Sequence, residues 1–109
     1  MAYNQVLAGR VRDHLSPRVA FEEKVMFGGI AFMVNGNMAL GVLGDGLIVR
    51  AGLARFEAAL EKPGADLFQP TGKPMSGWVI VAPEGHQTEE SLESWIEMAL
   101  EFVQTLPAK

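Results

Sequence analysis

The stretch from Lys24 to Gly52, KVMFGGIAFMVNGNMALGVLGDGLIVRAG, constrains the fold more than any other part of the chain. Its apolar runs are interrupted by two polar pairs, Asn35-Gly36 and Asp45-Gly46. Such pairs between apolar runs are typical of tight β-hairpins, because the turns need residues that tolerate positive φ. The stretch therefore predicts a three-stranded antiparallel meander over about residues 24–34, 38–43 and 47–51.

Gly28-Gly29 falls inside the first of these runs, where we interpret it as a one-residue β-bulge rather than a turn. A bulge shifts the alternation of side chains by one residue and so separates two apolar sets. One face then carries Val25, Phe27, Ile30, Phe32 and Val34, and the other carries Met26, Ala31 and Met33. Since both faces are apolar, we expect both to be covered, either by helices or by a second copy of the chain.

A glycine-rich loop that binds phosphate is the alternative interpretation of this stretch. Its glycines do not form a G-x-G-x-x-G motif, and no predicted strand leads through a glycine turn into a helix. Gly72-Lys73 is followed by Pro74 instead of the Ser or Thr of a phosphate loop. The glycines are thus expected to shape a sheet.

Three helices are predicted around this sheet. Residues 3–15 place Tyr3, Leu7, Val11 and His14 near one helical face, and residues 53–61 turn Leu53, Phe56 and Leu60 inward. Thr88 is the expected N-cap of the last helix. Its apolar stripe is Leu92, Trp95, Ile96, Ala99, Leu100, Val103 and Leu106.

Two further strands complete the prediction: a short edge strand at Leu67-Phe68 and a buried strand over residues 78–82. The order α-β-β-β-α-(β)-β-α indicates an α+β fold. We expect an antiparallel sheet of four to five strands packed with three helices, in a single domain over residues 1–109.

Charge and composition limit the function classes. The net charge is −4, and residues 84–109 hold six Glu against one Lys, which disfavours a large surface for nucleic-acid phosphates. The chain has no cysteine, no apolar run of membrane-spanning length and no signal-peptide pattern. These features predict a cytoplasmic protein that does not enter a membrane.

No catalytic, metal or cofactor site is predicted. The chain lacks a G-x-S-x-G motif, and its two histidines have no second metal ligand at helical spacing. We expect His14 to be a half-buried helix residue and His86 a loop residue before the last helix. A triad assembled only by the fold stays open at this point.

Met26-Phe27-Gly28-Gly29, followed by a hydrophobic strand and Asn35-Gly36, resembles the N-terminal domain of the TfoX/Sxy proteins. The later segments DGLIVRAG and FQPTGKPMSGWVIV, and a last helix with Trp95, agree in order with that family. The resemblance implies a stand-alone domain without the second, C-terminal domain of the competence regulators. It also implies a link to transcriptional co-activation with partners such as a cyclic-AMP receptor protein, and it supplies no catalytic residues.

The favoured function is thus a non-catalytic regulatory module that binds a protein partner and forms a homodimer. The candidate structural motif consists of Met26, Phe27, Gly28, Gly29, Asn35 and Gly36. The candidate interaction surface consists of Arg18, Lys24 and Arg50. Direct nucleic-acid binding through a local basic patch is the alternative, and an enzyme with an unrecognised site is the third hypothesis.

Overall fold

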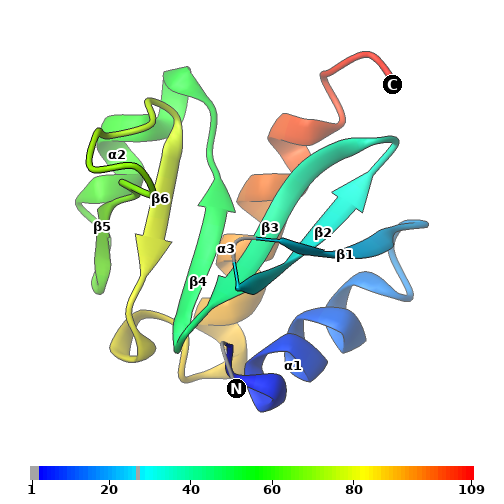
Figure 1. Ribbon diagram of the computed structural model, residues 1–109, viewed down its shortest axis with the longest axis horizontal. Coiled ribbons are helices and arrows are strands. Elements are labelled where there is room, and N and C mark those ends of the chain that lie inside the picture. The colour runs from blue at the N-terminus through cyan, green and yellow to red at the C-terminus, as the bar shows by residue number, and fades with distance from the viewer. Residues whose placement is uncertain (1–2, 27) are drawn as a thin grey trace.

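A six-stranded antiparallel sheet, in the order β1-β2-β3-β4-β6-β5, forms the centre of the computed structural model (Figure 1). The structure describes residues 3–26 and 28–109. The strands are β1 (Glu22–Met26), β2 (Gly29–Val34), β3 (Asn37–Leu43), β4 (Gly46–Arg50), β5 (Ala65–Leu67) and β6 (Trp78–Val81). The predicted α+β class and element order are confirmed, with six strands in place of four to five.

The additional strand arises because the first predicted strand is a hairpin. Met26 pairs with Gly29, so the chain reverses between them, and the prediction of a bulge at Gly28-Gly29 is wrong. Gly28 has φ 76°, which suits a tight turn. A Cβ at Gly29 would lie 2.4 Å from the carbonyl oxygen of Val42 on β3, so only glycine lets β2 and β3 approach so closely. Phe27 lies outside the described residues.

The other two meander turns occur near the predicted places. Asn35 and Gly36, with φ of 53° and 81°, join β2 to β3. Between β3 and β4, Leu43 pairs with Gly46, so the turn residues are Gly44 and Asp45, one position earlier than the Asp-Gly pair suggested. A register shift does occur in the β2–β3 pair, between Phe32 and Met33.

Helix ends are fixed by their capping residues. The helices are α1 (Gln5–Leu15), α2 (Phe56–Leu60) and α3 (Glu89–Val103), with 3₁₀ turns η1 (Leu53–Arg55) and η2 (Pro83–Gly85). Asn4 and Thr88 accept backbone N–H groups at the starts of α1 and α3, as expected of N-caps. None of the helices in the described ranges is long and apolar enough to cross a membrane.

The inward orientation predicted for Leu53 is wrong. Residues 53–55 form the 3₁₀ turn η1, and the Leu53 side chain is 73% exposed. Phe56 and Leu60, one turn later in α2, are partly buried against the core as predicted.

All three helices cover the same face of the sheet. α3 packs on β3 and β4, α1 packs on α3 and β3, and α2 packs on β5 and β6. In Figure 1, α3 lies behind the sheet, so the viewer looks onto the opposite face. Ala31 and Ile48 are buried on that opposite face, outside the helix-covered core cluster. The helices of the described residues therefore cover one face only, so of the two expected ways to cover both faces, helices or a second copy of the chain, the first is wrong.

We expect two glycine substitutions to have opposite effects. Gly29→Ala forces a Cβ against backbone and should lower the free energy of unfolding by about 1–3 kcal/mol. Gly9→Ala is the matched control, because a Cβ there meets only the flexible Arg12 side chain at 4.0 Å. This substitution should raise the free energy of unfolding by about 0.5–1 kcal/mol. Urea unfolding followed by circular dichroism measures both. Equal effects of the two changes would contradict the close approach at Gly29.

Candidate functional site

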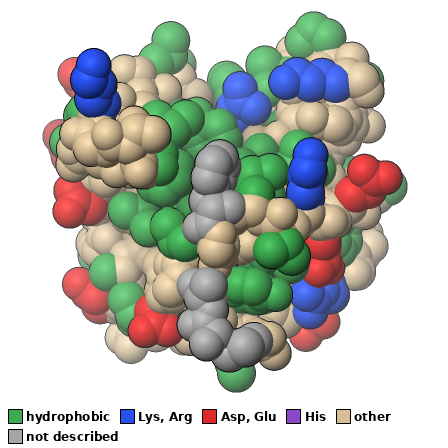
Figure 2. Space-filling view, viewed as in Figure 1, with side chains coloured by type: hydrophobic (Ala, Val, Ile, Leu, Met, Phe, Trp, Pro, Cys, Tyr) green, Lys and Arg blue, Asp and Glu red, His purple; other side chains and the backbone are tan. Residues whose placement is uncertain are grey.

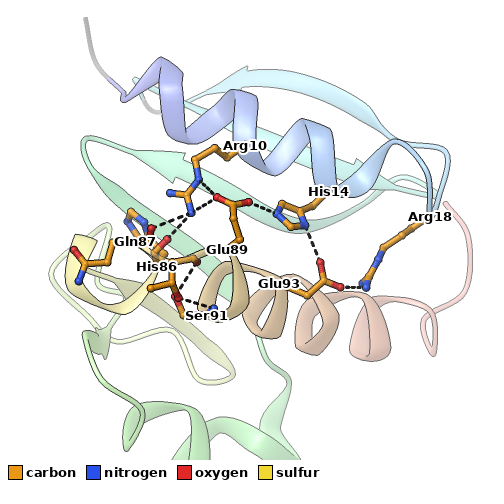
Figure 3. Close-up of polar contacts among 9 residues, drawn as sticks. Arg10, His14, Arg18, His86, Gln87, Glu89, Ser91 and Glu93 are labelled. Carbon is orange, nitrogen blue, oxygen red and sulfur yellow. Dashed lines mark hydrogen bonds and ion pairs between the residues drawn. The ribbon is translucent and has the colours of Figure 1, made fainter.

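The most connected polar cluster joins α1 to α3, and we call it the helix seam (Figure 3). It consists of Arg10, His14, Arg18, Glu89 and Glu93. Arg10 donates to Glu89 at 2.9 Å and also to the backbone carbonyl of His86 at 3.0 Å. Arg18 pairs with Glu93 at the other end. The seam therefore attaches the first helix and the turn after it to the last helix.

His14 occupies the middle of the helix seam. Its Nδ1 lies 2.7 Å from a Glu93 oxygen and its Nε2 lies 2.8 Å from a Glu89 oxygen. A neutral imidazole carries one N–H and the imidazolium carries two, so both contacts are hydrogen bonds only when His14 is protonated. The side chain is 20% exposed, in agreement with the predicted half-buried helix position.

The helix seam also lowers the pKa of one of its carboxylates. The hydrogen bond from His14, followed by that from Arg10, lowers the pKa of Glu89. At the neighbouring β1, the hydrogen bond from Arg12 lowers the pKa of Glu23. A lowered folded-state pKa stabilises the protein above the ordinary glutamate range, and this stabilisation disappears as the pH falls through the folded-state value.

Most basic side chains are engaged within the chain. Besides the seam arginines, Arg12 pairs with Glu23 and Arg55 pairs with Glu101. The Lys62 ammonium lies 4.4 Å from the centre of the Trp95 ring and donates to Ser94. A partner phosphate would have to displace these acidic and aromatic groups.

The three residues of the candidate interaction surface lie on different parts of the fold. Arg18 belongs to the helix seam. Arg50, at the end of β4, has its guanidinium 5.0 Å from the Trp78 ring centre and 5.4 Å from that of Phe102. Lys24 is exposed on β1, and within residues 3–26 and 28–109 it has no ion-pair partner. The structure does not gather them into one patch, and their role stays a prediction.

The described residues of the candidate structural motif lie at the two ends of β2. Met26, Gly28 and Gly29 form the described part of the β1–β2 turn, and Asn35-Gly36 forms the β2–β3 turn. Asn35 also accepts the backbone N–H of Lys109 at 2.8 Å. These residues shape the sheet, and the described ones present no reactive group.

The sheet face opposite the helices, which we call the open face, carries the second apolar set that the sequence predicts, Met26, Ala31 and Met33. One cross-strand row runs over all six strands of this face: Lys24, Ala31, Gly41, Ile48, Ile80 and Asp66. Its middle is apolar and its two ends carry opposite charges. Figure 2 shows hydrophobic side chains on parts of this face. The row depends on strand register, which the sequence pattern alone does not give.

A hollow of about 590 Å³ marks the β5–β6 end of the open face. Ile80 and Gly46 lie among its lining residues, together with the carboxylates of Asp45, Asp66 and Glu84. Acidic side chains follow the left margin of Figure 2 in agreement with this position. The open face is thus acidic at one end, and at the other it carries Lys24 with Glu22 two residues away on the same strand.

Neither histidine is placed for nucleophilic catalysis. His86 lies in the turn before α3, as predicted, where its side chain is buried and its Nε2 contacts the backbone carbonyl of Asp45 at 2.9 Å. Neither His14 nor His86 hydrogen bonds to a hydroxyl group in the part of the chain that the structure describes. Among these same residues there is no cluster of three or more metal-type ligands.

Acidic pH should lower the free energy of unfolding through Glu89 of the helix seam and through Glu23 of β1. As the pH falls below the ordinary glutamate pKa of about 4.3, Glu89 and Glu23 become protonated and the free energy of unfolding should decline. Glu89→Gln should lower stability at neutral pH and flatten this decline. Urea unfolding at stepped pH values measures both effects.

Glu90→Gln is the matched control for that substitution. Glu90 is the neighbouring exposed residue in the first turn of α3 and lies outside the seam contacts. Its replacement should leave the pH dependence near that of the wild type. If the two variants showed the same pH profile, the seam would not be the source of the acid sensitivity.

Comparison with known proteins adds a family to these observations. The family model described as the TfoX N-terminal domain matches residues 13–103, which is most of the chain. A search of curated proteins finds no match. The matched segment runs from the end of α1 through the whole sheet to the end of α3. The chain therefore belongs to the TfoX N-terminal domain family.

Proposed function

We propose that this protein is a non-catalytic regulatory module that binds another protein through its open face. The observation that carries the proposal is the apolar middle of a sheet face on which no helix of the described chain packs. An antiparallel sheet with one solvated face normally alternates apolar and polar residues. Here Met38 and Ile80, which are partly exposed, stand where polar side chains are expected, beside the buried Ile48. Such a face suits a protein partner.

Membership of the TfoX N-terminal domain family supports the regulatory part of the proposal. A role in transcriptional regulation or competence would be exerted through a protein partner, since residues 3–26 and 28–109 offer an apolar surface and no cluster of metal-type ligands. Self-association into a homodimer would use the same face.

Direct nucleic-acid binding has less support. Phosphate contacts need basic side chains that are free to neutralise negative charge. Arg10, Arg12, Arg18 and Arg55 already pair with glutamates, and α3 presents further carboxylates beside them. The surface formed by α1 and α3 would therefore repel a duplex as readily as attract it.

Site-specific photocrosslinking in living cells tests the proposal. A benzophenone amino acid replaces Ile80 on the open face, and in a second strain it replaces Glu57, an exposed residue of α2 on the helix side. We expect covalent protein adducts from position 80 and few from position 57. Mass spectrometry of the adducts identifies the partner.

The opposite distribution would contradict the proposal. Adducts concentrated at position 57 would move the interaction surface to the helices. If neither position yielded a protein adduct while nucleic acid co-purified with the chain, the nucleic-acid alternative would replace it.

A further inference from the structure

We infer that the partner seated on the open face is a second copy of this chain, turned so that Lys24 of each copy meets the acidic hollow of the other. This inference rests on the proposed function, since it uses the same face. It adds the identity of the partner and the orientation of the two copies. The two charged ends of the cross-strand row carry the inference.

The row is self-complementary in charge. Lys24 on β1 and Asp66 on β5 lie at opposite ends of six strands, roughly 24 Å apart at the ~4.8 Å spacing of neighbouring strands. A two-fold axis parallel to the strands and between β3 and β4 exchanges the two ends. Each Lys24 then faces the Asp66 of the other copy, as an isologous contact requires.

The alternative axis, along the row, is disfavoured by the same charges. It would place Lys24 opposite Lys24 and Asp66 opposite Asp66, and like charges brought together destabilise an interface. The charge pattern thus selects one of the two simple ways of stacking this face on itself.

The acidic hollow supports the same orientation. Asp45 and Glu84 stand beside Asp66 around the hollow of about 590 Å³, so one cation faces three carboxylates. Lys24 is exposed on the edge hairpin and without an ion-pair partner in the described ranges, so it is available to enter the hollow. Ile80 lines the hollow and continues the apolar middle of the row.

The edges of the sheet offer less for self-association. Edge strand β1 carries Glu22, Glu23 and Lys24 in succession, and charges on an edge oppose strand pairing between copies. The other edge strand, β5, has three residues with Asp66 in the middle. Face-to-face contact is therefore the arrangement that buries apolar surface without pairing these edges.

Oligomeric state across a charge-swap series tests the inference. The full chain and its variants are measured by sedimentation equilibrium over a wide concentration range. We expect the wild type to dimerise, and Lys24→Asp and Asp66→Lys each to raise the dimer Kd about tenfold or more. The double variant Lys24→Asp/Asp66→Lys should recover a Kd near the wild-type value, because each pair is re-formed with reversed signs.

Lys73→Asp is the matched control, because Lys73 lies in the exposed loop between β5 and β6 and outside the row. It makes the same change of charge and should leave the Kd unchanged. All substituted side chains are exposed, and thermal unfolding verifies that each variant is folded. A dimer weakened equally by Lys73→Asp, or not recovered by the double variant, would overturn the orientation.

The outcomes also separate this inference from the proposed function. A wild-type chain that stays monomeric at every concentration, yet gives adducts with a different protein from position 80, overturns the second copy and leaves the interaction module. A monomer that gives no adduct from position 80 overturns both.

Discussion

The burial of α3 against one side of the sheet is the contact on which the rest of the structure depends. Trp95, at the centre of this contact, is 1% exposed and donates from its indole Nε1 to the Gly85 carbonyl at 3.0 Å. A large apolar side chain is therefore buried without losing its hydrogen bond. α1 then packs beside α3 through the helix seam. With α2 on the same side, the described helices leave the other face of the sheet open.

This one-sided packing assigns opposite roles to the charges. Glutamates of α3 pair with arginines of the α1 segment, so the acidic helix acts inside the fold as well as on its surface. Lys24 and Asp66, by contrast, lie on the open face, at the two ends of the cross-strand row. Charges on the helix side thus serve stability, and we propose that those on the open face serve recognition.

Much of this fold was predictable from sequence because it rests on local signals. The Asn35-Gly36 hairpin, the Thr88 cap and the apolar stripe of the last helix each depend on neighbouring residues, and the α+β order follows from them. The β1–β2 hairpin was missed because Gly28-Gly29 lacks the Asn-Gly or Asp-Gly signature. The need for glycine at position 29 comes from tertiary packing, because Gly29 lies against the backbone of Val42, thirteen positions along the chain.

The candidate site was less predictable for the same physical reason. Lys24 was singled out from sequence, but its relation to Ile80 and Asp66 arises only when five successive strand registers are fixed. Arg18 was equally visible as a basic residue, and its pairing with Glu93 depends on how α1 and α3 pack. Sequence identified charged residues, and only the fold separates those that are engaged from those that are available.

The central claim is that the open face is where this protein meets a second copy of itself. The most direct measurement is a dilution series of two-dimensional ¹H–¹⁵N NMR spectra of the labelled chain. We expect concentration-dependent shifts at the amides of the cross-strand row, strongest at Ile48 and Ile80, with α3 unchanged. Shifts confined to the glutamate face of α3, or no shifts over the series, would contradict it.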